Sequence, residues 1–306
     1  MNFKKKALII FYICLLFSIG FFVMEIYNNS IDKNNNKNIM EDNLPGVTGP
    51  GTNTISYGLY KDDELLENHE QKFSGKEKLT LSLSNFVGFS REYVIVALLD
   101  YIQTEIEVNG KNTRTYKFSV GENETKNIPF IIDIPEDTHE FSLLVFKDPN
   151  FVELDNESYN SLSSLEEVIA LRFNLNGSNK IIPETMKAEG EKSSLPIVPL
   201  FLSSTYDELK IVTEHFNNDT LYLFSGEYEI GNEKEQAIIV FNDWEQISLN
   251  DNMVNYLETT NKMKYYPLNL TNKGIYQIVS FPEPYNVNNT NRESQRVYSS
   301  FRFYSY

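Results

Sequence analysis

The sequence is poor in the residues that most often carry catalysis or cross-link an exported fold. Cys14 is the only cysteine among 306 residues, so no disulfide can form within the chain. There are three histidines and one tryptophan, and 27 basic residues face 43 acidic ones, which leaves a net charge of −16. A surface of that sign repels phosphate backbones, and no basic stripe relieves it, so we expect no nucleic-acid partner.

The three histidines do not fit the common catalytic motifs. His69 is followed by glutamate but lacks the second histidine of HExxH, and Gly88–Glu92 ends in glutamate where a nucleophile elbow needs glycine. No glycine-rich phosphate loop and no calcium loop occurs. We therefore expect no cofactor, no metal site and no catalysis. A hydrolase without a recognisable motif, in which His139 or His215 meets two carboxylates, is the last alternative.

One long stretch lacks charge altogether. Ala7–Met24 contains eighteen uncharged, mostly apolar residues, and a helix of that length covers roughly 27 Å, close to the thickness of a bilayer. Lys4–Lys6 precede it and Glu25 follows it, which predicts a single-pass anchor with the N-terminus in the cytoplasm and the bulk outside. The outer part then carries −19, which is −16 minus three lysine charges. The alternative is secretion after signal cleavage, which the bulky exit Phe21–Met24 disfavours.

An exported region of this size without a disulfide is typical of Gram-positive bacterial surface proteins, since secreted eukaryotic modules are usually cross-linked. Residues 25–54 are first polar and of low complexity, then broken by proline and glycine. This composition predicts a flexible linker with a root-mean-square span of about 30 Å. The remaining chain would be held near the membrane but free to reorient.

Strand patterns fill the rest of the chain. Leu79, Leu81 and Leu83 alternate with polar residues, and Tyr93–Leu99 is apolar on both faces, which predicts a central strand. We expect β-sandwich domains at residues 55–180 and 196–306, joined by a charged linker at 181–195. The predicted fold class is therefore all-β: an N-terminal transmembrane helix within residues 1–24, then two antiparallel immunoglobulin-like β-sandwich domains.

Three local details can also be predicted. Ser161–Ala170 has a helical period with serine at its start. The hairpin around Val108–Gly110 needs a three-residue loop that pairs Glu107 with Lys111, because a two-residue turn would separate the apolar faces of its strands. Tyr276 follows a turn in the pattern of a tyrosine corner, in which the phenol bonds back to that turn.

Gly121–Phe146 (GENETKNIPFIIDIPEDTHEFSLLVF) resembles the strand, proline and aspartate turn, and strand of bacterial cell-surface immunoglobulin-like modules, including those named for cell adhesion. The resemblance covers about 26 residues and implies a β-sandwich. It brings no functional residue with it. Ile278 stands where antibody domains carry a cysteine, which agrees with a version without disulfides.

The best candidate for binding is a loop near the C-terminus. Pro282–Gln295 is polar, fourteen residues long, and placed between the last two predicted strands. Long loops on rigid sheets commonly carry binding residues. The candidate binding residues are Tyr285, Asn286, Asn288, Asn289 and Arg292.

We therefore predict a membrane-anchored, extracellular, non-catalytic binding protein whose partner is a cell-envelope protein or polysaccharide. A carbohydrate module would present exposed rings, and Tyr285 is the ring least expected in a core. The other candidate rings are Trp244, Tyr256, Tyr265 and Tyr266. A structural spacer or subunit of an envelope complex would instead show a long unpaired strand edge.

Overall fold

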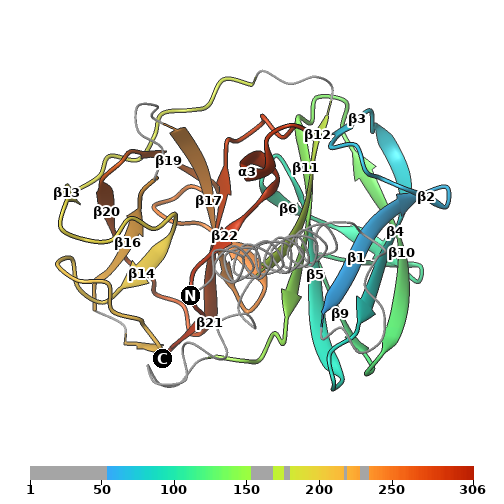
Figure 1. Cartoon of the computed structure of the whole chain (residues 1–306), viewed down its shortest axis with the longest axis horizontal. Coiled ribbons are helices and arrows are strands. Elements are labelled where there is room, and N and C mark those ends of the chain that lie inside the picture. The colour runs from blue at the N-terminus through green and yellow to red at the C-terminus, as the bar shows by residue number, and fades with distance from the viewer. Residues whose placement is uncertain (1–53, 153–167, 176–179, 217–218, 228–233) are drawn as a thin grey trace, which may run out of the picture.

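The computed structural model describes residues 54–152, 168–175, 180–216, 219–227 and 234–306, so the predicted anchor and almost all of the predicted linker at 25–54 lie outside the described residues. Across these ranges, no helix is long and apolar enough to cross a membrane. Four sheets, named A to D below, form two sandwiches that lie side by side (Figure 1). The prediction of an all-β fold is confirmed.

Domain 1 contains sheets A and B. The strands of sheet A are, in spatial order, β2 (Glu64–Leu65), β1 (Ile55–Lys61), β4 (Gly75–Asn85), β10 (Glu124–Ile134), β7 (Ile106–Val108) and β8 (Lys111–Thr113). Those of sheet B are β3 (Glu70–Gln71), β12 (Val168–Leu175), β11 (Glu140–Lys147), β5 (Arg91–Leu99) and β6 (Ile102–Thr104), with β9 (Thr115–Val120) also paired to β5. All of these pairs are antiparallel except β3 with β12.

Domain 2 contains sheets C and D. The strands of sheet C are β13 (Gly190–Lys192), β20 (Met263–Leu268), β16 (Leu221–Ser225) and β14 (Phe201–Ser203). Those of sheet D are β15 (Glu214–His215), β23 (Phe303–Ser305), β21 (Gly274–Pro282), β17 (Lys234–Asn242) and β18 (Glu245–Ile247), with β19 (Asn255–Thr259) paired to β17 and β22 (Tyr298–Ser299) to β21. One helical turn, α3 (Arg292–Gln295), precedes β22.

The stretch expected as the interdomain linker, residues 181–195, is built into domain 2. Its strand β13 pairs with β20, and the Met186 N–H donates to the Tyr256 carbonyl at 2.7 Å. Met186 and Ala188 also contact the core between sheets C and D. Much of the expected linker therefore belongs to the second sandwich.

Each sandwich has its own core, and a third core joins the two domains. The alternating leucines of β4 point into the first core, as the period of two predicts. In β5, Ile95 and Ala97 contact that core, whereas Val94 and Val96 contact domain 2. Both faces of β5 are therefore covered, which explains its uninterrupted apolar sequence.

Sheets B and D dock through equivalent faces. Their strand orders match one to one, and the β5–β6 and β17–β18 hairpins have identical registers when 143 is added to each residue number of the first. The third core is formed by six equivalent pairs together with Tyr256 and Tyr285. The pairs are Val94 with Ala237, Val96 with Ile239, Leu98 with Phe241, Tyr101 with Trp244, Leu144 with Val279, and Phe146 with Phe281.

Two local predictions are wrong. Val168–Ala170, the described part of the expected helix, lies in strand β12, because these residues complete sheet B against β11. The hairpin uses the two-residue turn Asn109-Gly110, with φ of 52° and 74°, and pairs Val108 with Lys111. The chain then moves from sheet A to sheet B after Thr113, so the apolar residues farther along belong to another sheet and their faces need not match.

The predicted tyrosine corner is confirmed. The Tyr276 hydroxyl donates to the Asn272 carbonyl at 3.0 Å and accepts from the Asn272 N–H at 3.1 Å. Its ring stacks on Phe303, with centroids 5.3 Å apart, inside the core of domain 2. The corner therefore fixes the start of β21, the strand that leads into the predicted binding loop.

Candidate functional site

The predicted binding loop, Pro282–Gln295, lies at the boundary between the domains. Tyr285 is only 3% exposed, so the expectation that its ring is available to a ligand is wrong. Its hydroxyl bonds to that of Tyr256 at 2.8 Å, and its ring contacts Tyr101 of domain 1. The ring is buried because domain 1 covers it, a contact that cannot be seen in the sequence around Tyr285.

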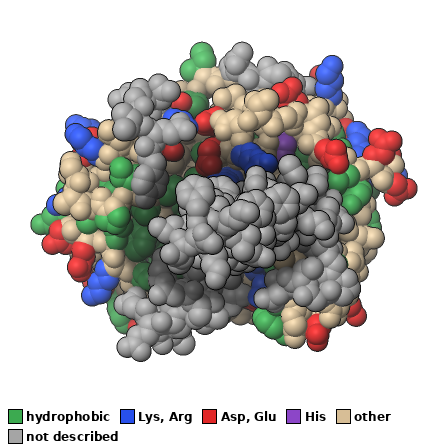
Figure 2. Space-filling model, in the orientation of Figure 1, with side chains coloured by type: hydrophobic (Ala, Val, Ile, Leu, Met, Phe, Trp, Pro, Cys, Tyr) green, Lys and Arg blue, Asp and Glu red, His purple; other side chains and the backbone are tan. Residues whose placement is uncertain are grey.

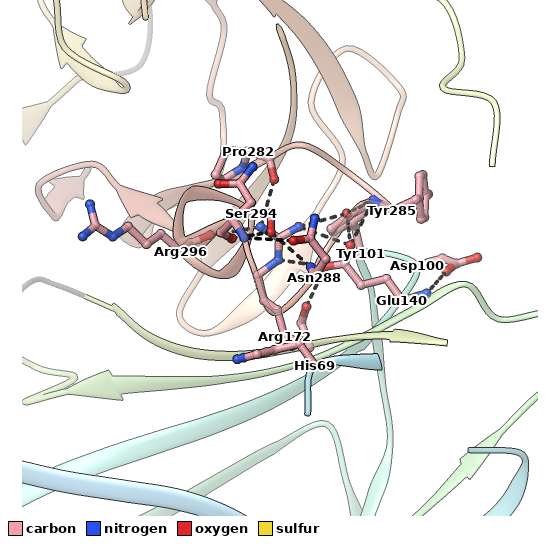
Figure 3. A network of polar contacts seen from close by, with 12 residues as sticks. His69, Asp100, Tyr101, Glu140, Arg172, Pro282, Tyr285, Asn288, Ser294 and Arg296 are labelled. Atoms are coloured by element: carbon pink, nitrogen blue, oxygen red, sulfur yellow. Dashed lines mark hydrogen bonds and ion pairs between the residues drawn. The ribbon is translucent and has the colours of Figure 1, made fainter. Parts of the chain in front are cut away.

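Tyr285 belongs to a buried polar network centred on Arg172, whose side chain is fully buried (Figure 3). The Arg172 Nε donates to Glu140 Oε1 at 2.9 Å, and its Nη1 donates to the carbonyl of Pro282 at 2.9 Å. The Tyr101 hydroxyl donates to Glu140 Oε2 and accepts from the backbone N–H of Tyr285. Side chains of domain 1 thus bind the backbone of the predicted loop.

The electrostatics of this network favour an ion pair between the Arg172 guanidinium and the Glu140 carboxylate. Burial alone would lower the pKa of the Arg172 guanidinium, but the Glu140 carboxylate and the Tyr101 hydroxyl together raise it by more, so the net shift is upward. Burial, reinforced by Glu140, raises the pKa of the Tyr101 phenol well above 10.0. The guanidinium is therefore charged and the phenol neutral at physiological pH, and all three groups hold the domains together.

Two of the predicted binding residues shape the loop itself. The Asn288 Oδ1 accepts from the backbone N–H of Thr290 at 3.1 Å and of Asn291 at 2.9 Å, while its Nδ2 donates to the Asn286 carbonyl at 3.1 Å. Asn291 then caps α3 by accepting from the N–H of Glu293. Asn286 and Asn288 are therefore engaged in turns of the kind that asparagine commonly stabilises.

Asn289 and Arg292 lie instead on a groove of about 1280 Å³, here called the edge groove. One wall is formed by β1 and β12 of domain 1, and the other by residues 289–297 of domain 2. Asn289 reaches across and accepts from the backbone N–H of His69 at 2.8 Å. Figure 2 shows basic side chains beside a histidine near the centre of this face of the molecule. The predicted loop therefore contributes two candidate residues to the groove and places Tyr285 beneath the surface.

The groove runs along an open strand edge. β3 pairs with β12 only at Asn174 and Leu175, and the Asn174 N–H donates to the His69 carbonyl. Since backbone groups alternate in direction along a strand, the N–H and C=O of Ala170 face the same side as that N–H. Within the described residues, neither group of Ala170 has a hydrogen-bond partner. The edge thus offers a free donor and a free acceptor to the groove.

The side chains around the groove are more basic than the protein as a whole. Four lining residues are basic and one, Glu67, is acidic, in a chain with a net charge of −16. Arg91 pairs with Asp148 at 3.6 Å, and Arg296 with Glu293 at 3.0 Å. Arg292 is exposed and forms no ion pair or hydrogen bond with a described residue. The other basic residue is Lys147.

The other predicted candidates lie apart from the groove. Trp244, Tyr256 and Tyr266 are buried core residues, and Tyr265 is half-buried on sheet C. His139 lies near the Asp100 carboxylate, with 3.4 Å between Nδ1 and Oδ2. Neither His139 nor the buried His215 lines the groove. No cluster of three or more potential metal ligands occurs within the described ranges.

The repeat that creates the interface leaves a signal in the sequence. Residues 92–103 (EYVIVALLDYIQ) and 235–246 (EQAIIVFNDWEQ) share a glutamate, an isoleucine, an aspartate and a glutamine at equivalent positions. The last strands add a second match, because Leu171-Arg172-Phe173 corresponds to Phe301-Arg302-Phe303. A search for internal repeats at spacings of 130–143 residues could have identified Arg172 and Arg302 as equivalent.

Comparisons with known proteins do not identify a family for this chain. No protein-family model matches the sequence, and no curated protein matches it. The CARDB domain of the PF1109 protein from Pyrococcus furiosus is 12% identical, covers 40% of this chain and 92% of its own, and has a TM-score of 0.23. PapD-like domain 7 of human CEP192 is 12% identical, covers 43% and 89%, and has a TM-score of 0.20. Red sea bream transglutaminase is 8% identical, covers 82% and 31%, and has a TM-score of 0.22. Scores this low decide nothing about fold or function.

Proposed function

We propose that this protein is a non-catalytic binding protein whose ligand site is the edge groove. The observation that carries this proposal is the open edge of β12, where Ala170 offers backbone groups that have no partner among the described residues, inside a basic groove. Proteins normally cover or block exposed strand edges. An open edge that faces residues 289–297 of the other domain is therefore suited to binding a ligand. Within the described residues, the facing sides of sheets B and D are covered by their contact in the third core.

A cross-linking experiment tests the position of the site. A photoreactive phenylalanine analogue is placed at Arg292 on the groove wall and, as a matched control, at Lys117, an exposed residue of β9 away from the groove. Illumination of native cells should give a discrete adduct only for the Arg292 variant. Equal labelling from both positions, or none from either, would remove the edge groove as the ligand site.

We also propose that the protein is anchored through residues 7–24, with its two domains outside the cell of a Gram-positive-type bacterium. The uncharged segment and the lysines before it support this orientation. Protease added to intact cells should digest the domains while a short fragment stays with the membrane fraction. Recovery of intact protein after that treatment, together with a cytosolic fraction containing the bulk of the chain, would contradict the proposal.

A carbohydrate-binding module remains a second candidate, on different residues from those predicted. Phe216, Tyr304 and Tyr306 are 56%, 41% and 46% exposed, and Phe216 stacks on Tyr306 with centroids 5.4 Å apart. Adjacent exposed rings can hold sugar faces through their apolar surfaces. Tyr304→Ala should then reduce retention on cell-wall polysaccharide, whereas the same change at half-buried Tyr265 should not. Unchanged retention of Tyr304→Ala would eliminate this candidate.

A further inference from the structure

The edge groove already shows how it can take an extended chain. β3 pairs in parallel with the last two residues of β12, Asn174 and Leu175. This pairing begins at Glu70, and the preceding residues Asn68 and His69 lie outside β3. Beyond that point, Val168–Leu171 continues the same edge along the groove. The His69 ring lies at the junction, with Nδ1 2.7 Å from the Arg172 carbonyl. The protein's own short strand therefore marks the line along which a longer strand would bind.

The side chains on either side of this line determine what kind of strand fits. Ile169 and Leu171 contact the core of domain 1, and Val168 and Ala170 contact the interdomain core, so the edge itself is small and apolar. The opposite wall of the groove includes Arg292, Gln295, Arg296 and Val297. A bound strand would place alternate side chains on opposite faces of sheet B. One set of its side chains would lie near the basic wall, and the other would lie against apolar surface.

Charge complementarity favours an acidic ligand. The basic residues outnumber the single acidic residue on the groove lining four to one. The exposed Arg296–Glu293 pair is of the kind that contributes little to stability, so Arg296 can exchange its partner for a ligand carboxylate. Arg292 has no described partner to give up. A basic segment would instead meet repulsion from these guanidinium groups.

Resting on the proposed function of the groove, we propose that the ligand is an extended acidic segment of a partner protein, bound by strand addition to β12. Its backbone pairs with the free N–H and C=O of Ala170, in line with β3. Its carboxylates lie against Arg292 and Arg296, and apolar side chains alternate with them. Main-chain hydrogen bonds supply affinity in this mode, and the alternating side chains supply specificity.

Three peptides test the separate parts of this proposal, and one of them is also used with a shortened chain. The first is a fluorescein-labelled peptide of about eight residues in which valine alternates with glutamate, a length that spans the open edge. The second has lysine in place of glutamate, and the third is the acidic peptide with alternate backbone amides methylated. The acidic peptide is also tested on a chain that lacks residues 1–53. Binding is measured by fluorescence anisotropy to the full chain held in detergent.

Two variants test the protein side of the contact. Ala170→Pro removes the outward N–H while the flanking Ile169 and Leu171 keep their pairing with β11, and proline is tolerated at such edge positions. Arg292→Glu reverses the charge on the opposite wall. Lys117→Glu makes the same charge change on an exposed part of β9 that does not line the groove, and serves as the control.

We expect the acidic peptide to bind the full chain. Its affinity should fall about tenfold or more when its backbone is methylated or its glutamates are replaced by lysine. Ala170→Pro and Arg292→Glu in the protein should each lower the affinity by a similar factor. Lys117→Glu should bind as the unaltered chain does. Equal binding of the acidic and lysine peptides, or of the methylated and unmethylated ones, would overturn strand addition of an acidic segment. If Ala170→Pro still weakened the binding of these peptides, strand addition of an acidic segment would be rejected but the groove would remain the ligand site.

The remaining outcomes are also decisive. Binding that appears only after residues 1–53 are removed would show that the chain's own N-terminal segment occupies the groove, and would overturn an external partner. Failure of all peptides on both chains, combined with a discrete cross-link from the Arg292 position, would reject the acidic strand while the proposed function stands. Failure of the peptides with no cross-link would reject both.

Discussion

The two halves of the domain interface use the same arginine with different acceptors. Arg172 of β12 and Arg302, just before β23, occupy equivalent positions, and both side chains are fully buried. Each crosses to the other domain at an equivalent carbonyl, Arg172 to Pro282 at 2.9 Å and Arg302 to Lys147 at 2.8 Å. The Nε of Arg172 donates to the Glu140 carboxylate, whereas that of Arg302 donates to the amide of Gln277.

The acceptors also come from different places on their strands. Glu140 corresponds to Ile275, and Gln277 corresponds to Ser142, so the acceptor has moved by two residues between β11 and β21. Residues two apart on a strand share a face, so either position can reach the docking arginine. The two domains therefore share the position of the docking arginine on its strand. The group that accepts from its Nε differs, being a carboxylate in one domain and an amide in the other.

The largest difference between the halves should appear when each acceptor is removed. Glu140→Ala leaves the Arg172 charge buried without its carboxylate and should cost about 3–5 kcal/mol of unfolding free energy. Gln277→Ala removes a neutral acceptor and should cost about 1–3 kcal/mol. Urea denaturation of both variants measures the two losses. Equal losses would mean that the carboxylate contributes no more than the amide.

A double variant sharpens this first comparison. Replacing the whole pair, with Arg172→Met and Glu140→Leu together, removes the buried charge along with its partner. Such replacements are often neutral or stabilising, so the double variant should recover most of the stability that Glu140→Ala loses. A double variant as unstable as Glu140→Ala would show that Arg172 acts mainly through its bonds to the Pro282 and Arg296 carbonyls.

The next effect concerns a contact that is the same in both halves. The backbone N–H of Gln103 donates to Gln246 Oε1, and the N–H of Gln246 donates to Gln103 Oε1, each at 2.6 Å. Gln103→Ala and Gln246→Ala each leave a buried N–H unpaired and should each cost about 1–3 kcal/mol. Each substitution removes one of the two reciprocal bonds, and loss of one bond should weaken the other, so the double variant should lose less than the two single losses added together. Denaturation of the three variants checks this, and strict additivity would show that the two bonds act independently.

The sequence predicts the elements of this molecule better than their association. The alternation in β4 and the doubly apolar β5 lead to the sandwich class, because strand periodicity records which faces are buried. The tyrosine corner could be predicted because its partner lies only four residues away. The Asn109-Gly110 turn was misjudged because its strands were assumed to remain in one sheet.

The candidate site could be predicted only in part from the sequence, for a similar reason. Pro282–Gln295 has the composition of an exposed loop, and Asn289 and Arg292 do line the edge groove. Tyr285 is buried by Tyr101 and Glu140, which lie 184 and 145 residues away in the chain. Polar composition cannot show that a loop binds another domain of the same chain. The equivalence of the two docking faces was the available clue, since a repeated buried arginine implies a repeated contact.

A smaller effect should distinguish Tyr101 from its equivalent, Trp244, through pH. The folded-state pKa of Tyr101 is raised above its unfolded value of 10.0 by burial and by Glu140, so the neutral phenol is the form that stabilises the fold. That contribution is complete below pH 10 and is lost as the pH rises above it. Tyr101→Phe should therefore reduce the alkaline fall in unfolding free energy by about 1.4 kcal/mol per pH unit above pH 10.

The control for this effect is the equivalent aromatic, which does not titrate. Trp244→Phe should lower stability at every pH because it removes a ring that contacts Phe146, but it should leave the alkaline slope unchanged. Denaturation at several pH values between about 9 and 11 measures both slopes. The slopes are compared with the unaltered chain, because burial also raises the pKa of Tyr266 and Tyr285. A slope unaffected by Tyr101→Phe would show that this phenol does not titrate in that range.

The smallest effect should come from a pair that has no counterpart in the other half. Arg114 of domain 1 lies 3.5 Å from the Glu245 carboxylate of domain 2, with side chains 40% and 47% exposed. At the position equivalent to Glu245, domain 1 has Ile102, so the repeat cannot form this pair twice. Exposed pairs contribute about 0–1 kcal/mol, so Glu245→Ala should change stability far less than Gln246→Ala, one residue away. If denaturation gave equal losses, the interface would depend on surface charge as much as on its buried symmetric contacts.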